Sequence, residues 1–285
     1  MDLCDRNDIQ ALLARHGFRF AKALGQNFLI EGWVAEDIAA ASGADADTGV
    51  VEVGPGIGSL TTQLARRAGK VTAVELDKSL LPILSETLTD FPNAEVVPGD
   101  VMKLDLKALA AEHLAGLTPM VCANLPYNIT TPVITAFLEA GCFSAVTVMI
   151  QREVARRICA APGTSDYGAF SLFCQYYAET ELLFDVPPEC FLPAPKVTSA
   201  VIRCKTRPAP PVQVQSEAAF WRTVRAGFAL RRKTLVNSLQ TGWELPKDTL
   251  TDIVTACGLE PTVRGERLGL EEYARLSDAL LDAAE

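Results

Sequence analysis

Residues 50 to 151 alternate short runs rich in β-branched residues with segments that have the spacing of amphipathic helices. The runs are VVEVG (50–54), VTAVEL (71–76), AEVVPGD (94–100), MVCANLP (120–126) and AVTVMIQ (145–151). Apolar strands that alternate with helices are typical of a parallel sheet covered by helices. The pattern therefore predicts an α/β fold whose ligands bind where the carboxyl ends of the strands meet.

The chain after residue 151 predicts a sheet edge and then a second domain. The segments ELLFDVP (181–187) and TSAVIRC (198–204) are expected to pair as antiparallel strands. A proline-rich break, PAPPV, comes next, and Ser216 is placed to cap the first of several helices. These helices are expected over 217–240, 247–257 and 271–283. The predicted domains are residues 1–207 and 208–285.

The composition and the first residues of the chain indicate the cellular compartment that we expect for the protein. The chain has 285 residues, 49% of them hydrophobic and 21% charged, which suits a globular protein with a core. It contains no run of about 18 apolar residues that would span a membrane. The first ten residues, MDLCDRNDIQ, carry charges throughout, so we expect neither a signal peptide nor a transit peptide. A cytoplasmic protein without a membrane partner is predicted.

Cysteine and histidine usage limits the chemistry. Eight cysteines are scattered without a CxxC pair, which indicates reduced thiols and neither a disulfide framework nor a zinc site. Only two histidines, His16 and His113, are present, and this argues against metal or triad chemistry based on histidine. We expect no metal, and a monomer is the default expectation.

Glycines and acids follow the first three predicted strands. Gly54, Gly56 and Gly58 stand where the first strand turns into a helix, for which Ser59 is the expected cap. Their GxGxG spacing differs from the GxGxxG that seats a pyrophosphate, and a plain glycine-rich turn is the alternative. Glu75 ends the second strand, where a carboxylate can accept both hydrogen bonds of a ribose diol.

Asp100 ends the third strand, where it can accept a hydrogen bond from an adenine amino group. Taken singly, each of these acids has an ordinary alternative explanation. Glu75 is then a solvent-facing acid at the end of a strand, and Asp100 is an ordinary turn aspartate. Together with the glycines they indicate a site for an adenosine-containing cofactor without an essential pyrophosphate. S-adenosylmethionine fits that description best.

The tetrapeptide Asn124-Leu125-Pro126-Tyr127 ends the fourth strand at the same edge. The exocyclic amine of a base is a poor nucleophile because its lone pair is delocalised into the ring. The side-chain oxygen of Asn124 and the carbonyl of Leu125 can accept from its N–H groups and so favour the reactive pyramidal form. Pro126 stiffens the turn and Tyr127 offers a face for stacking. A chance turn is the alternative to this amino-methylation site.

Basic residues are concentrated in one part of an acidic chain. The net charge is −9, which alone argues weakly against a nucleic-acid partner. Residues 186–233 nevertheless hold nine lysines and arginines and only two acids. This window is either a solvated surface or a face that binds phosphates.

Seven segments resemble the ribosomal RNA adenine dimethyltransferases of the bacterial KsgA type. They are LGQNFL (24–29), VEVGPGIGSLT (51–61), VELD (74–77), GD (99–100), NLPYNITTP (124–132), FLPAPKVTSAV (191–201) and RRKTLVNSL (231–239). The resemblance runs in order from about residue 17 to the C-terminus. It implies an α/β, Rossmann-like class I S-adenosylmethionine-dependent methyltransferase domain with a small C-terminal helical domain that binds rRNA. It also implies that four methyl groups are transferred to N6 of two adjacent adenines near the 3′ end of the 16S rRNA of the small ribosomal subunit, with a further role in the biogenesis of that subunit.

The resemblance also assigns roles to matching positions. Residues 1–30 form a segment that closes over the cofactor, through Asn27 and Leu29. Phe191 is the second stacking face opposite Tyr127, although a core aromatic beside a proline turn is the plainer interpretation. The implied cofactor-binding residues are Asn27, Leu29, Gly54, Gly56, Gly58, Glu75, Asp100 and Asn124. The resemblance implies that Lys196, Arg231, Arg232 and Lys233 bind phosphates, and the basic window adds Arg222 and Arg225 to the predicted RNA-binding residues.

Three other functions remain open from the sequence. A large-subunit rRNA methyltransferase that confers macrolide resistance shares the fold and the Asn-x-Pro-Tyr logic, but RRKTLVNSL favours the small-subunit type. DNA adenine methyltransferases usually carry an aspartate where this chain has Asn124. A ribosome-assembly factor for which methylation is secondary is the third alternative.

Overall fold

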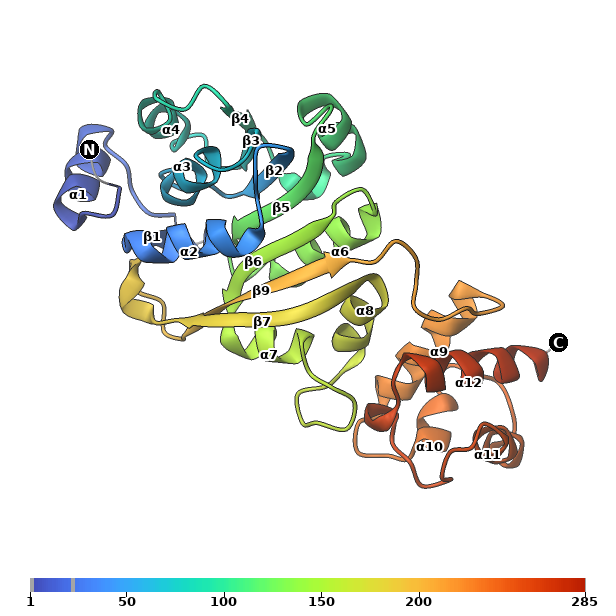
Figure 1. Cartoon of the computed structure of the whole chain (residues 1–285). Helices are drawn as coiled ribbons and strands as arrows, with labels where there is room; N and C mark the ends of the chain where they lie inside the picture. The colour runs from blue at the N-terminus through green and yellow to red at the C-terminus, as the bar shows by residue number, and fades with distance from the viewer. Residues whose placement is uncertain (1–2, 22–23, 285) are drawn as a thin grey trace. The chain divides into compact units, whose positions relative to one another are not determined.

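The computed structural model describes residues 3–21 and 24–284 (Figure 1). The chain divides into two compact units. The first comprises Met1–Ala155 and Ala178–Thr206, and the second comprises Arg156–Tyr177 and Arg207–Glu285. The second unit thus includes a segment before residue 178 that the predicted boundary after residue 207 assigns to the first domain.

The first unit is built around a β-sheet. Among the described residues, the strand order of this sheet is β4-β3-β2-β5-β6-β9-β7. Its strands are β2 (Thr48–Val53), β3 (Lys70–Glu75), β4 (Ala94–Pro98), β5 (Thr118–Asn124), β6 (Ala145–Gln151), β7 (Ala178–Val186) and β9 (Ser199–Thr206). The strands β2 to β6 are parallel, whereas β9 is antiparallel to both β6 and β7. The predicted parallel sheet and its antiparallel edge pair are confirmed. The chain order reverses between β2 and β5, and sheets of this kind bind ligands at the carboxyl ends of the strands beside such a reversal.

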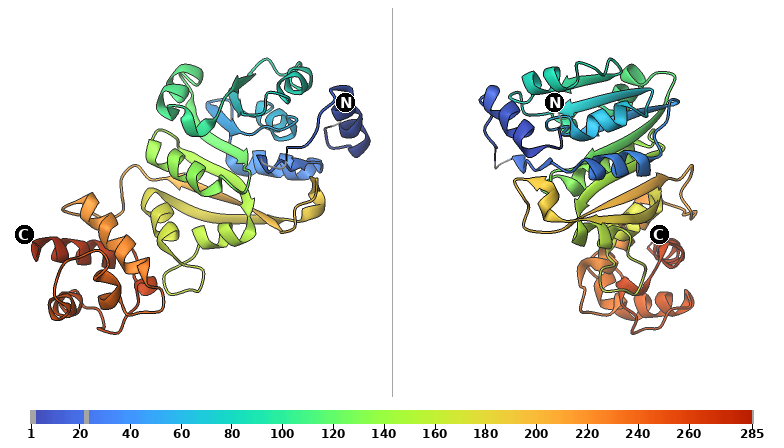
Figure 2. Two further views of the ribbon diagram at one scale, coloured as in Figure 1. Left: turned by 180° about the vertical axis from the view of Figure 1, so that it is seen from behind. Right: turned by 60° about the vertical axis from the view of Figure 1, so that its left-hand side comes forward.

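Helices cover both faces of the sheet, as Figure 1 and Figure 2 show for α2 (Gly32–Ser42) on one face and α6 (Thr130–Ala140) on the other. Both helices end at a glycine in the left-handed region, Gly43 and Gly141. Apolar residues of α2 and α3 (Ser59–Ala65) form a buried core with residues of the strands, among them Val50 and Val71. Further helices of the unit are α4 (Leu81–Thr87), the 3-10 turn η2 (Val101–Lys103), α5 (Leu106–His113), the start of α7 (Arg152–Ile158) and the 3-10 turn η3 (Pro188–Cys190).

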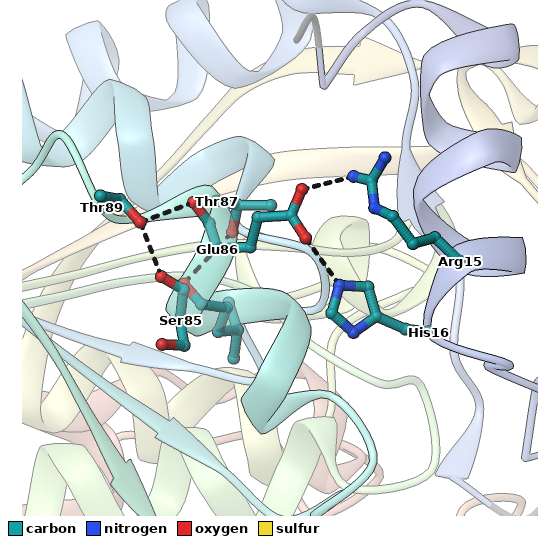
Figure 3. Close-up of polar contacts among 7 residues, drawn as sticks. Arg15, His16, Ser85, Glu86, Thr87 and Thr89 are labelled. Atoms are coloured by element: carbon teal, nitrogen blue, oxygen red, sulfur yellow. Dashed lines mark hydrogen bonds and ion pairs between the residues drawn. The ribbon is translucent and has the colours of Figure 1, made fainter.

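The N-terminal helix α1 (Arg6–Arg15) is fastened to α4. Its apolar residues share a buried cluster with residues of α4. At its end, Arg15 pairs with Glu86, and His16 Nε2 lies 2.7 Å from the other carboxylate oxygen of Glu86 (Figure 3). Further on, the short strand β1 (Phe28–Leu29) pairs antiparallel with β8 (Phe191–Leu192).

The second unit is helical. It contains α8 (Ala169–Tyr177), α9 (Glu217–Ala229), α10 (Leu235–Leu239), α11 (Lys247–Ala256), the 3-10 turn η4 (Gly265–Arg267) and α12 (Leu270–Asp282). Ser216 caps α9 as predicted, because its side chain accepts from the backbone N–H of Ala219. Tyr167, Leu172 and Tyr176 share a buried core with residues of α9 to α12, which is why this earlier segment belongs to the second unit.

Two details differ from the sequence predictions. The helix expected over 217–240 is interrupted, since α9 ends at Ala229 and Thr234 is the N-cap of a new helix, α10. Gly58, and not Ser59, is the N-cap of α3. Ser59 is buried and its hydroxyl donates to the carbonyl of Leu29 at 3.2 Å, so it fastens β1 instead of capping a helix. Within the described residues, no helix is both long enough and apolar enough to cross a bilayer.

Candidate active site

A cavity lies at the carboxyl edge of the sheet, where β2, β3 and β5 end. Residues 24–29 line it from the N-terminal part of the chain. Ten of the predicted site residues line this one cavity. They are Asn27, Leu29, Gly54, Gly56, Glu75, Asp100, Asn124, Leu125, Pro126 and Tyr127. The structure therefore brings together residues that are spread over about 100 positions of the sequence.

The turn after β2 forms part of the wall. Gly54 and Gly56 have φ angles of 68° and 61°, which side chains disfavour. A Cβ atom on Gly56 would lie 3.0 Å from the ring of Phe28, so this glycine also permits close packing of the N-terminal segment. Gly58 does not line the cavity. A Cβ atom there would lie 3.0 Å from Thr87 Oγ1, so close packing against α4 requires a glycine at this position.

Glu75 ends β3 with its carboxylate held in place. The side chain is 5% exposed, and Oε1 accepts from the backbone N–H of Asp77 at 2.7 Å. Burial raises the pKa of the Glu75 carboxyl, although the backbone donor of Asp77 opposes the shift. A buried acceptor of this kind at the rim of a cavity suits the hydroxyl groups of a ribose.

Both carboxylate oxygens of Asp100 have a contact within the protein. Oδ1 accepts from the backbone N–H of Met102 at 3.1 Å and caps η2, as a turn aspartate would. Oδ2 lies 3.7 Å from the ammonium group of Lys103. The residue lines the cavity, so the turn contact and a ligand contact are compatible in the same side chain.

Asn124 joins the two sides of the cavity. Its side-chain nitrogen donates to the backbone carbonyl of Asn27 at 3.2 Å. A carbonyl can only accept, so the nitrogen must face Asn27 and the side-chain oxygen is the acceptor left for a ligand. The backbone N–H of Leu125 donates to the carbonyl of Met149 at 3.1 Å, which ties the following turn to β6.

Tyr127 is half-buried on the cavity wall, and its hydroxyl lies 2.7 Å from Ser199 Oγ. Burial raises the pKa of the Tyr127 phenol, so it is neutral at physiological pH. Phe191 is placed differently from the prediction. It is 1% exposed and packs in the core with Leu29, Val34 and Val201, and it does not line the cavity. Its pairing in β8 with β1 turns the ring into the core, as the plainer interpretation holds.

Glu52 lines the cavity as well, although the sequence patterns did not predict it as a site residue. It lies in β2, is 1% exposed, and its Oε2 has no hydrogen-bond partner among the described residues. Burial raises its pKa to about 8, opposed by Thr61 and reinforced by the charge of Glu75. An acid inside the apolar run VVEVG was the available signal. Gln26, next to Asn27, also lines the cavity without having been predicted.

The predicted phosphate-binding residues are exposed in both units. Lys196 belongs to the first unit, and the others belong to the second. Arg222 has a structural contact of its own, because its guanidinium lies 4.3 Å from the ring centroid of Trp243. Arg231 Nε lies 3.7 Å from Glu266 Oε2. Arg225, Arg232 and Lys233 are exposed on α9 and on the turn that follows it. Among the described side chains, no cluster of histidine, cysteine or acidic residues could hold a metal ion.

Solved structures of the same fold support the class. The structure is similar to that of the 23S rRNA methyltransferase ErmE, with a TM-score of 0.70 and 28% identity over 89% of this chain and 99% of that one. It also shares its fold with a dimethyladenosine transferase from Plasmodium falciparum, with a TM-score of 0.72 and 21% identity over 87% and 95% of the two chains. The fold is that of class I S-adenosylmethionine-dependent methyltransferases.

The sequence comparisons narrow this class to a family. The family model described as ribosomal RNA adenine dimethylase matches residues 17–280. The ribosomal RNA small subunit methyltransferase A of Geobacillus thermodenitrificans is 47% identical, over 98% of this chain and 97% of its own. The protein of the same name from Alkaliphilus oremlandii is 46% identical over 94% of both chains. The chain belongs to the ribosomal RNA adenine dimethylase family.

Proposed function

We propose that this protein transfers methyl groups from S-adenosylmethionine to N6 of two adjacent adenines near the 3′ end of 16S rRNA, and that N6,N6-dimethyladenosine is formed at both. One observation carries the proposal. The tetrapeptide Asn124 to Tyr127 opens into the same cavity as Glu75 and Asp100. The turn proposed to activate the target amine and the two acids proposed to bind the cofactor's nucleoside therefore line the same cavity.

The residues of the cavity fit the cofactor. Gly54 and Gly56 leave room beside the turn after β2, where the methionine part would lie. Glu75 would hold the ribose and Asp100 the adenine, with Asn27 and Leu29 closing from the N-terminal side. The unpartnered oxygen of Glu52, in a carboxyl whose raised pKa keeps it protonated at neutral pH, is a further polar group within the same wall. When bound, S-adenosylmethionine supplies an electrophilic methyl group.

The chain's own residues act on the adenine. The side-chain oxygen of Asn124 and the carbonyl of Leu125 accept from the amino group and localise its lone pair for attack. Pro126 stiffens this turn, and the ring of Tyr127 stacks against the base and holds it out of the RNA stack. Catalysis then rests on positioning and electrostatics, and solvent water removes the proton from the methylated nitrogen.

Phosphate contacts would supply affinity for the RNA. The exposed residues proposed for this role are Lys196, Arg222, Arg225, Arg231, Arg232 and Lys233. Phosphate contacts orient the RNA on the protein and make its affinity depend on salt concentration. The tetrapeptide Asn124 to Tyr127 then determines which atom of the base is methylated. We take the enzyme to act in the cytoplasm as a monomer, without a metal ion, and to contribute to biogenesis of the small subunit.

The relatives favour the small subunit over the alternatives. Identity is 47% to a protein named ribosomal RNA small subunit methyltransferase A, and 28% to a 23S rRNA methyltransferase. Asn124 at the head of the tetrapeptide argues against a DNA adenine methyltransferase. An assembly factor with secondary methylation remains compatible with the same fold.

Substrate choice tests the proposal. Purified protein is incubated with labelled S-adenosylmethionine and, separately, small subunits, large subunits or duplex DNA from cells that lack the modification. We expect label in small subunits, its loss in Asn124→Ala, and its retention in Asn7→Ala, which changes an exposed asparagine of α1. Label only in large subunits or DNA would overturn the proposal. Tight binding to small subunits without any label would support the assembly factor instead.

A further inference from the structure

Gln26 makes two hydrogen bonds in opposite directions. Its side-chain oxygen accepts from the backbone N–H of Ala21 at 2.9 Å, and its side-chain nitrogen donates to Asp77 Oδ2 at 2.7 Å. The first partner can only donate, so the amide orientation is fixed by chemistry. The second bond runs to a carboxylate, and hydrogen bonds to ionised groups are about twice as strong as neutral ones.

Asp77 is itself held in one position. Its Oδ1 accepts from the backbone N–H of Ser79 at 2.9 Å and from the Ser79 hydroxyl at 2.6 Å. Partial burial tends to raise the pKa of Asp77, but the donors of Ser79 and Gln26 outweigh it and the pKa is lowered. The carboxylate is therefore ionised at neutral pH and fixed as an acceptor for Gln26.

Asp77 is also linked to the cavity. Its backbone N–H donates to Glu75 Oε1 at 2.7 Å, so one residue connects Gln26 to the acid proposed to hold the ribose. At the other side of the cavity, the carbonyl of Asn27 accepts from Asn124 at 3.2 Å. The segment Leu24–Leu29 is thus fastened to the end of β3 through Gln26 and to the end of β5 through Asn27.

We propose that Gln26 is a positioning residue that holds the segment Leu24–Leu29 against the cavity through its bond to Asp77. It acts through Asn27 and Leu29 and touches no reacting atom. Fastening the segment in the free protein lowers the ordering cost of binding, so Gln26 raises cofactor affinity. The importance of that affinity for methyl transfer rests on the proposed function, but the fastening does not.

The hydrogen bond between Gln26 and Asp77 can be tested by exchanging its donor and its acceptor. In Gln26→Glu, two carboxylates face each other. In Asp77→Asn, the side-chain nitrogen of residue 77 meets that of Gln26, and a flipped Gln26 would turn its nitrogen toward the N–H of Ala21. In the double variant both oxygens of the introduced glutamate accept, one from Ala21 and one from the introduced asparagine. The asparagine oxygen still accepts from Ser79.

Two readouts apply to the four proteins. Hydrogen exchange of the free protein reports the backbone amides of residues 24–30, and calorimetry reports the affinity for S-adenosylhomocysteine and S-adenosylmethionine. We expect each single variant to exchange faster there and to bind about tenfold more weakly, the loss of one bond to a charged group. The cofactor affinity of the double variant should return to within about threefold of wild type, because the hydrogen bond forms again with donor and acceptor exchanged. In turnover, KM for the cofactor rises while kcat holds.

Two variants at exposed sites serve as controls for these substitutions. Gln240→Glu and Asp90→Asn make the same chemical changes at exposed sites and should match wild type. Single variants with unchanged exchange and affinity would overturn the inference, as would a double variant no better than either single one. A wild-type protein that methylates no adenine, but shows this exchange and rescue pattern, would refute the proposed function and leave the fastening intact.

Discussion

The side-chain nitrogen of Asn124 donates to the backbone carbonyl of Asn27 at 3.2 Å, across 97 positions of the sequence. This bond connects the end of β5 to the N-terminal segment that lines the cavity. It also determines which atom of Asn124 remains to face a substrate amine, because the donor end is already committed. The site is therefore assembled by the contact of two segments that are distant in the sequence.

Replacing Asn124 should damage catalysis more than folding. Asn124→Ala removes the acceptor proposed for the adenine amine, and the loss of one such oriented group costs on the order of 100-fold in kcat. Asn124→Asp keeps an acceptor but places a carboxylate against the carbonyl of Asn27, so we expect it to weaken cofactor binding as well. Single-turnover kinetics and calorimetry separate these effects. Full activity of Asn124→Ala would contradict the assigned role.

Tyr127 should act through its ring more than through its hydroxyl. Tyr127→Phe loses the bond to Ser199 but keeps the stacking face, so kcat/KM for the subunit should fall by about two- to tenfold. Tyr127→Ala also loses stacking, and about 10- to 100-fold is expected. Steady-state kinetics with undermethylated subunits makes the comparison. Equal losses in the two variants would show that the hydroxyl, and not the ring, is what matters.

Glu52 should make stability fall as the pH rises. Its pKa is raised to about 8 by burial, so the folded state keeps a proton that the unfolded state releases above the ordinary value of 4.5. The contribution is complete below about pH 4.5 and is lost progressively as the pH rises to about 8. Glu52→Gln stays neutral and should be more stable than wild type at pH 8, by on the order of 4 kcal/mol.

Urea unfolding of both proteins at pH 5, 6.5 and 8 tests the Glu52 prediction. The two curves should converge at low pH and separate at high pH, since only wild type carries the titrating group. Parallel pH dependence in wild type and Glu52→Gln would show that this carboxyl is not the group responsible.

The exposed basic residues should govern the salt dependence of RNA binding. Arg232→Ala and Lys233→Ala each remove one phosphate contact, so each should reduce the slope of log K against log salt by about 0.7 to 0.9. Fluorescence anisotropy with a 16S rRNA fragment, measured from low to moderate salt, gives the slope. Lys247→Ala, an exposed lysine of α11, is the matched control. Slopes indistinguishable from wild type would place the RNA elsewhere.

The sequence was sufficient for features set by local pattern and chain order. The alternation of strands and helices predicted the parallel sheet, and strand ends carried Glu75, Asp100 and Asn124 to one edge because parallel strands share a direction. It was insufficient where a side chain's direction depends on distant packing. Phe191 turns into the core because β8 pairs with β1.

Long-range contacts account for the other omissions. The bond of Gln26 to Asp77 spans 51 positions, and no local pattern distinguishes this glutamine from its neighbours. Arg156–Tyr177 belongs to the helical unit because its aromatic residues pack with α9 and α12, a partnership invisible to hydrophobic spacing. Glu52 was visible as an acid within an apolar strand, but its burial and raised pKa depend on the elements packed around it.

The most direct test of the central claim is the number and position of dimethyladenosines formed on one substrate. Small subunits from cells lacking the modification are incubated with the protein and S-adenosylmethionine, and the 16S rRNA is then digested and sequenced by mass spectrometry. We predict N6,N6-dimethyladenosine at two adjacent positions near the 3′ end, four methyl groups per subunit, and none with Asn124→Ala. Methylation at a single adenine, at unrelated positions, or equally with Asn124→Ala would contradict it.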